Sequence, residues 1–164
     1  LQTYNSLFDD TIEANIAFAA HGASAAAVGQ VVDDLGVRDW IETMPDGLST
    51  RVGERGDQLS AGERQLVALL RAGLADPDIL ILDEATSSVD ALTEVRIARA
   101  LERLAASRTT IAIAHRLSTA ARADRVLVLD HGRLVEDGHH DDLVERGGPY
   151  RSLYDAWVSA TTLS

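Results

Sequence analysis

The sequence contains no cysteine and no lysine. Without cysteine the chain can form neither a disulfide nor a thiolate metal site, which fits a reducing compartment. No apolar run approaches the roughly 20 residues that a membrane-spanning helix needs. No basic region followed by an apolar stretch marks a signal peptide at the N-terminus. We therefore expect any membrane role to come through partner segments.

The absence of lysine also excludes one phosphate site. A phosphate-binding loop needs a glycine-rich turn and a lysine that reaches the phosphates, and this chain has neither. All 15 basic residues are arginine, against 26 acidic residues, and the net charge is −11. Such an acidic chain, with a pI near 4.7, argues against a nucleic-acid partner. With 164 residues, 46% of them hydrophobic, it can bury one core or two small ones.

The stretch Leu59–Gln65 predicts the start of a helix. Ser60 and Glu63 have the spacing of a capping box, and apolar residues follow at helical spacing until Asp76-Pro77-Asp78. One interpretation is that Ser60 and Glu63 only cap the helix. The other is that Ala61-Gly62 leave the helix end bare, so that its amides and dipole suit a phosphate.

A second stretch, Ile79–Leu82, predicts a parallel strand buried on both faces, and Asp83 and Glu84 follow at its carboxyl end. Open α/β sheets bind their ligands at that end. One carboxylate can help to hold Mg²⁺, and the other can take a proton from an attacking water. The alternative is a solvated acidic turn.

The remaining pattern alternates helices with short strands. Helices are expected over 11–20, 24–35, 39–44 and 91–106, strands over 109–114 and 125–130, and a hairpin-like extension over 132–138. Asp90 is either only an N-cap or part of a site. The segment His139–Asp142 suggests a metal site only weakly, because adjacent residues at a helix start point in different directions. One helical face with Tyr150, Leu153, Tyr154 and Trp157 predicts core packing.

Four of these motifs, in this order, resemble those of ATP-binding cassette (ABC) proteins. Leu59–Gln65 is similar to their signature motif, Ile79–Glu84 to the Walker B strand and Ser87–Asp90 to the D-loop. His115 resembles the switch histidine. The loop Gly53–Gly56 is similar to one found in exporter-type cassettes. The resemblance covers essentially the whole chain.

The resemblance implies an α/β fold of the P-loop NTPase, ABC type. Residues 1–75 would form the end of the Q-loop, a helical subdomain and the signature helix. Residues 76–164 would form the C-terminal part of the catalytic core, with a mainly parallel sheet and flanking helices. Because the phosphate-binding loop is missing, we expect the C-terminal portion of a nucleotide-binding domain, inactive by itself.

The resemblance also implies the cofactors ATP and Mg²⁺ and the residues that contact them. Asp83, with Gln2, would hold the Mg²⁺, Glu84 would act as general base, and His115 would orient the attacking water. The residues implied to contact the nucleotide across a dimer are Gln2, Ser60, Ala61, Gly62, Glu63 and Asp90. Glu63 stands where the family usually has glutamine, which places a negative charge near the phosphate unless the capping box turns it away.

The implied partners are a second nucleotide-binding domain, in a head-to-tail dimer, and transmembrane domains at the cytoplasmic face of the cell membrane. An ABC exporter is therefore the expected function. Three alternatives stay open. One is a soluble ABC ATPase acting on chromosomes or ribosomes. Another is a helicase of the type suggested by Asp83-Glu84-Ala85-Thr86, and the third is a non-enzymatic fragment that self-associates.

Overall fold

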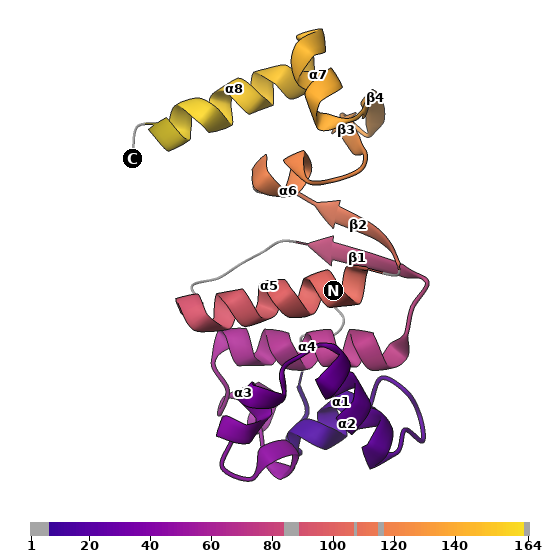
Figure 1. The fold of residues 1–164 in the computed structure, drawn as a ribbon, viewed down its shortest axis with the longest axis vertical. Helices are drawn as coiled ribbons and strands as arrows, with labels where there is room; N and C mark the ends of the chain where they lie inside the picture. Colours follow the sequence, from indigo (N-terminus) through magenta and orange to yellow (C-terminus); the bar gives the residue numbers. More distant parts are fainter. Residues whose placement is uncertain (1–6, 84–88, 107, 115–116, 163–164) are drawn as a thin grey trace. The chain divides into compact units, whose positions relative to one another are not determined.

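The computed structural model describes residues 7–83, 89–106, 108–114 and 117–162 (Figure 1). The chain divides into two compact units, residues 1–111 and 112–164. This grouping does not test the functional boundary predicted between residues 75 and 76. The elements are α1 (Ile12–Ala17), α2 (Ala25–Asp34), α3 (Arg38–Thr43), η2 (Gly47–Ser49), η3 (Glu54–Gly56), α4 (Ala61–Ala75), β1 (Ile79–Asp83), α5 (Ala91–Ala105), β2 (Thr109–Ile113), α6 (Leu117–Ala121), β3 (Val126–Asp130), β4 (Arg133–Gly138), α7 (His140–Arg146) and α8 (Pro149–Thr162).

Polar side chains cap helix starts in the first unit. The hydroxyls of Thr11 and Ser24 accept hydrogen bonds from the third amide of α1 and α2, at 3.1 and 3.2 Å. Each cap satisfies a backbone donor that has no partner inside the helix. Asp76, in the left-handed conformation (φ 45°), ends α4, just before the proline that cannot continue it.

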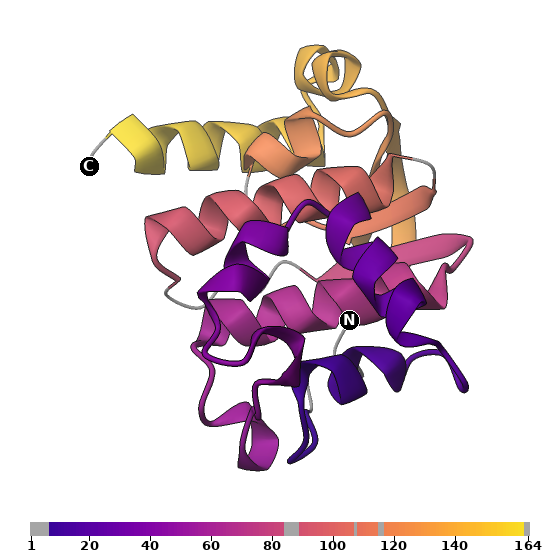
Figure 2. The same cartoon turned by 60° about the horizontal axis from the view of Figure 1, so that its bottom comes forward.

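The core of the first unit surrounds α4, which packs against α1, α2 and α5 (Figure 2). Leu66, Val67 and Leu70 of this helix are at most 1% exposed. Val28 and Val32 of α2 and Ile97 and Leu104 of α5 belong to the same apolar cluster. Burial of these side chains, at roughly 1.5–3 kcal/mol each, therefore supplies much of the driving force that holds the four helices together.

One arginine lies inside this core. Arg71 of α4 donates from Nε to the Asn15 carbonyl oxygen at 2.6 Å and from Nη2 to Asn15 Oδ1 at 2.7 Å. Asn15 in turn bonds to both backbone groups of Phe8. The guanidinium also lies 5.4 and 5.8 Å from the ring centres of Phe8 and Phe18, within cation–π range. This network ties the segment before α1 to α4.

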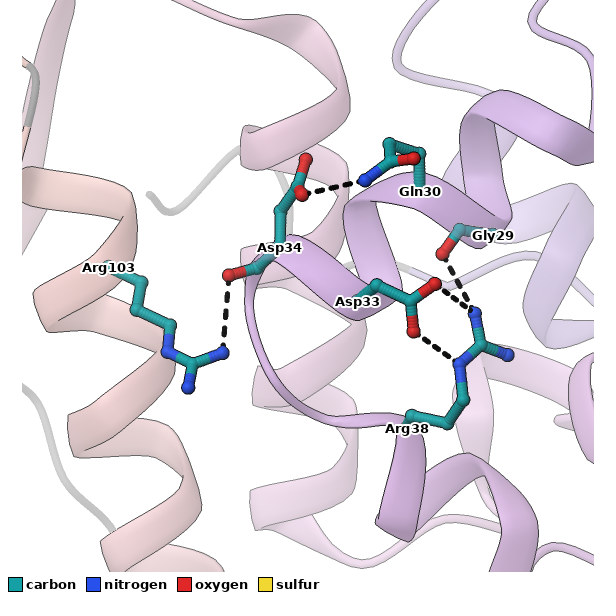
Figure 3. Close-up of polar contacts among 6 residues, drawn as sticks. All are labelled: Gly29, Gln30, Asp33, Asp34, Arg38 and Arg103. Atoms are coloured by element: carbon teal, nitrogen blue, oxygen red, sulfur yellow. Dashed lines mark hydrogen bonds and ion pairs between the residues drawn. The ribbon is translucent and has the colours of Figure 1, made fainter.

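Arginine side chains also satisfy the end of α2 (Figure 3). Arg38 of α3 forms an ion pair with Asp33 and donates to the Gly29 carbonyl at 3.0 Å. Arg103 of α5 donates to the Asp34 carbonyl at 3.4 Å. Cations are favourable near a helix C-terminus, and Asp34 is the last residue of α2, so its carbonyl has no partner within the helix. The contacts therefore fasten α2 to α3 and α5.

Strand β1 pairs with β2, and the two run in the same direction (Figure 1). The expectation that β1 is buried on both faces is wrong for the described chain. Leu80 is buried, but Ile79 and Ile81 are 56% and 54% exposed. Alternate side chains of a strand point to opposite faces, and only the Leu80 face is packed against the helical core.

The second unit contains a hairpin, in which β3 pairs antiparallel with β4. Its two-residue turn, His131-Gly132, has positive φ at both positions, as a turn matched to the strand twist requires. Tyr150 packs here with Leu143 and Ala120. The predicted packing of the last helix is wrong at Leu153, which is 48% exposed because the small cluster covers only the start of α8.

Among the described residues, none of the helices combines the length and the apolar character that crossing a membrane requires. The longest are α4 and α5, of 15 residues each, and both carry arginine and glutamate.

Candidate functional site

The start of α4 carries a complete capping box. Ser60 is the N-cap, and its hydroxyl accepts a hydrogen bond from the Glu63 amide at 3.2 Å. The Glu63 carboxylate accepts one from the Ser60 amide at 2.8 Å. The capping function predicted for both residues is confirmed. Two backbone donors remain at this helix end, the amides of Ala61 and Gly62, and in the described chain neither donates a hydrogen bond.

A tryptophan from another helix contacts the same carboxylate. Trp40 of α3 is 2% exposed, and its Nε1 donates to Glu63 Oε1 at 3.3 Å. Burial by itself would raise the pKa of Glu63, but the hydrogen bonds from Ser60 and Trp40 outweigh it and hold the pKa below its ordinary value. Glu63 is therefore ionised at neutral pH, and the capping box holds its carboxylate at the helix start and does not turn it away.

The starts of α4 and α5 lie side by side. A Cβ built on Gly62 would lie 2.7 Å from Val89 Cγ1 and closer still to the methyl group of Thr93. At the other end, a Cβ on Gly73 would lie 3.7 Å from Leu104. The two helices are therefore parallel, as both views show (Figures 1 and 2). Gly62 is the residue that permits this close approach, because any side chain there would collide with α5.

Asp90 is the N-cap of α5, with its carboxylate accepting the Thr93 amide at 3.0 Å. This backbone hydrogen bond is the main reason that the pKa of Asp90 is lowered. The charge of Asp90 acts on Glu63 as well, opposing its ionisation. The structure thus brings together two motifs that lie about 30 residues apart in the sequence, Ser60–Glu63 and Asp90, on one pair of helix ends.

Asp83 is the last residue of β1, at the carboxyl end of the strand, and it is exposed. The described part of the chain contains no group of three or more histidine, aspartate or glutamate side chains that could hold a metal ion. Mg²⁺ does not need one, because it is held by one or two carboxylates together with phosphate oxygens and water. The exposed carboxylate of Asp83, at the end of the described strand, fits that pattern.

Three predicted site residues, Gln2, Glu84 and His115, lie outside the described residues. The histidine pair before α7 is described. His140 shares a hydrogen bond of 2.7 Å with the hydroxyl of Tyr150, and their rings meet edge to face. His139 lies 3.8 Å from an Asp141 oxygen. His140 thus contributes to the packing of α8.

Sequence reasoning missed Trp40 and Thr93 as neighbours of the signature stretch. Trp40 is 23 residues from Glu63 in the chain, and Thr93 is 31 residues from Gly62. Both are tertiary contacts, and periodicity carries no information about which helix ends will meet. The sequence offers one signal that the starts of α4 and α5 could lie together. It predicts two helices with apolar faces, joined by one short parallel strand.

The chain is similar to known proteins over most of its length. The family model described as ABC transporter matches residues 2–87. An ABC transporter ATP-binding protein of Bacillus subtilis (strain 168) is 49% identical over 153 residues, which are 93% of this chain and 25% of that protein. An ATM1-type heavy metal exporter of Novosphingobium aromaticivorans is 49% identical over 148 residues, 90% of this chain and 24% of that protein.

A solved structure also matches, described as a bacterial Atm1-family ABC exporter with ATP bound. Its TM-score is 0.80 at 47% identity, and the match covers 92% of this chain and 26% of that one. The α/β fold predicted from the motifs is therefore confirmed. The chain spans about a quarter of the length of the relatives it matches.

Proposed function

The chain belongs to the ABC transporter family, and from that premise we propose that it is the C-terminal part of an ATP-hydrolysing domain that drives export. The observation that carries the proposal is the paired start of α4 and α5. It presents the amides of Ala61 and Gly62, which donate to no acceptor among the described residues, beside the cap of α5. The direction of transport rests on the relatives, one of which is named an exporter.

ATP would be shared between two such domains. The Ser60 hydroxyl and the amides of Ala61 and Gly62 would bind the terminal phosphate of the nucleotide held by the partner domain. Backbone amides at a helix start suit this task, because they point along the axis and the helix dipole favours an anion. Asp90 would reach across the same dimer interface and help to arrange the opposite site.

The second group of proposed roles belongs to the strand ends. Asp83 would hold Mg²⁺, which screens the phosphate charge, together with Gln2. Glu84 would accept the proton of the attacking water, and His115 would orient that water against the terminal phosphate. In these roles Asp83 and Gln2 hold the metal ion, His115 positions the water and Glu84 takes up its proton, and none of them needs to form a covalent bond.

The proposed partners are transmembrane domains and a second nucleotide-binding domain in a head-to-tail dimer, at the cytoplasmic face of the membrane. Closing of the dimer on ATP and its reopening after hydrolysis would be passed to the transmembrane domains. The small helices α1 to α3 would carry that contact. The match to a quarter of each exporter-type relative supports a larger protein around this chain.

The test is ATP hydrolysis by the full-length transporter in lipid nanodiscs. Glu84→Gln should abolish steady turnover and leave ATP trapped in a closed dimer, because the general base is lost while the phosphate contacts remain. Glu145→Gln, an exposed residue of α7, serves as the charge-matched control and should leave turnover unchanged. Normal turnover by Glu84→Gln would remove Glu84 as the base.

A second candidate concerns the 164 residues expressed alone. Ile79 and Ile81 of β1, and Leu129 of β3 at 70% exposed, leave apolar strand faces uncovered. Such faces favour association with another copy, so we propose that the isolated chain self-associates and does not hydrolyse ATP. A strictly monomeric chain in light scattering would contradict the first part, and steady turnover in a contaminant-free sample the second.

A further inference from the structure

An anion already lies at the phosphate-binding end of α4. Of the donors at this helix start, the Ser60 amide bonds to the Glu63 carboxylate and the Glu63 amide to the Ser60 hydroxyl. A carboxylate at a helix N-terminus is stabilised by the same partial positive charge that would attract a phosphate. The capping box therefore satisfies two donors of the helix start and keeps a negative charge there, while the amides of Ala61 and Gly62 remain available.

The hydrogen-bond partners that the described residues give this carboxylate are neutral. Its hydrogen bonds come from a backbone amide and from the indole of Trp40, and within the described residues Glu63 forms no ion pair. The neighbouring charge is that of Asp90, which has the same sign. Within the part of the chain that the structure describes, the negative charge of Glu63 is therefore held by neutral donors and meets no positive partner.

We propose that the carboxylate of Glu63 lowers the affinity for ATP at this site: its negative charge weakens the binding of the terminal phosphate to the start of α4, and Glu63 thereby sets the nucleotide affinity there. The inference rests on the proposed function, and it adds a determinant of affinity to that site. Glu63 does not touch the reacting atoms in this proposal. It acts through its charge on the helix start.

Replacing the Glu63 carboxylate with the amide of glutamine removes the charge and keeps the size and shape of the side chain. Glutamine keeps the side-chain oxygen that caps the Ser60 amide, since capping boxes use either residue. It removes the repulsion between the Glu63 carboxylate and the phosphate near the protein surface. That repulsion corresponds to roughly a three- to tenfold change in the dissociation constant at low ionic strength. It also removes a favourable carboxylate from the helix start. Glu63→Gln should therefore bind nucleotide more tightly while its nucleotide-free form becomes slightly less stable.

The experiment uses the full-length transporter and the β,γ-imido analogue of ATP with Mg²⁺, so that binding is measured without turnover. Calorimetry should give a dissociation constant roughly three- to tenfold lower for Glu63→Gln than for the parent protein, and a difference that shrinks when salt is raised from about 0.05 to 0.5 M. A change in packing alone would not depend on salt. The midpoint of thermal unfolding of Glu63→Gln without nucleotide should fall slightly below that of the parent protein.

Glu102→Gln is the charge-matched control. Glu102 is an exposed residue on α5, and the substitution removes the same unit of charge. It should leave the dissociation constant unchanged. An unchanged or weaker affinity in Glu63→Gln, or a gain that does not depend on salt, would overturn the inference while leaving the ATPase intact. A parent protein that neither binds the analogue nor hydrolyses ATP would instead overturn the proposed function, and the inference with it.

Discussion

The charged residues near the two ends of α4 lie in opposite environments. At the start, Glu63 is held by neutral donors at the edge of the unit, where a phosphate is proposed to bind. Eight residues later, Arg71 is 2% exposed and bonds to Asn15 inside the core. A charge at the first end can be changed at small cost to the fold, whereas a charge at the second end is part of the fold. Substitutions at the two ends should therefore separate binding from stability.

The largest effect is expected at Arg71. Arg71→Met keeps much of the apolar volume but removes the guanidinium donor from the Asn15 carbonyl oxygen and from Asn15 Oδ1, which keeps the Phe8 amide as a donor. Loss of a charged hydrogen-bond partner in a core costs about 3 kcal/mol or more, since the oxygens cannot turn to water. Urea unfolding followed by circular dichroism measures this loss.

The matched control is Arg99→Met on α5, where the arginine is exposed. It should change stability by less than about 0.5 kcal/mol. If Arg71→Met were no more harmful than this control, the difference drawn between the two ends of the helix would not hold.

The next effect is expected at Gly62. Gly62→Ala places a methyl group against Val89 and Thr93, so α4 and α5 must move apart. Overpacking of this kind costs typically about 1–3 kcal/mol. Gly29→Ala is a useful comparison, because a Cβ there meets only the end of the Arg38 side chain at 3.9 Å. It should stabilise α2 by about 0.5–1 kcal/mol, since alanine favours the helix. Equal effects of the two substitutions would contradict the close packing at Gly62.

Much of the start of α4 could be predicted from the sequence, because a capping box is a local pattern. Ser60 and Glu63 are three residues apart, and their mutual hydrogen bonds follow from that spacing alone. Most helix and strand positions were predictable for the same reason. What the sequence could not give is the meeting of distant parts: Trp40 with Glu63, and Gly62 with Thr93.

The burial of Arg71 is another feature that local sequence patterns could not predict. In a helical pattern an arginine is expected to be solvated, and nothing near it in the chain indicates burial. Its partner Asn15 is 56 residues away. The expectation that β1 is covered on both faces failed for a related reason. An apolar run predicts that a strand can be buried, but not which face the described chain covers.

A smaller effect on stability is expected at Ser60, where a substitution should also change nucleotide binding. Ser60→Ala removes the hydroxyl that caps the Glu63 amide, which costs about 1 kcal/mol of stability. Ser24→Ala is a close match, since Ser24 caps α2 with the same donor–acceptor distance of 3.2 Å. Both variants should lose similar stability in urea unfolding, but only Ser60→Ala should also weaken binding of the ATP analogue. Equal nucleotide affinity in the two would show that Ser60 is a cap and nothing more.

The smallest effect is a pH dependence at Glu63. Because hydrogen bonds lower its pKa in the folded state, its ionised form contributes stability above the ordinary value of 4.5, and this contribution is lost as pH falls through the folded-state pKa. The difference in unfolding midpoint between the parent protein and Glu63→Gln isolates that contribution, since the other acidic groups are common to both. The parent should be the more stable of the two at neutral pH, and its advantage should disappear below about pH 4.5. An advantage that persists into strong acid would mean that the charge of Glu63 does not stabilise the helix start, and the trade between stability and nucleotide affinity would lose its physical basis.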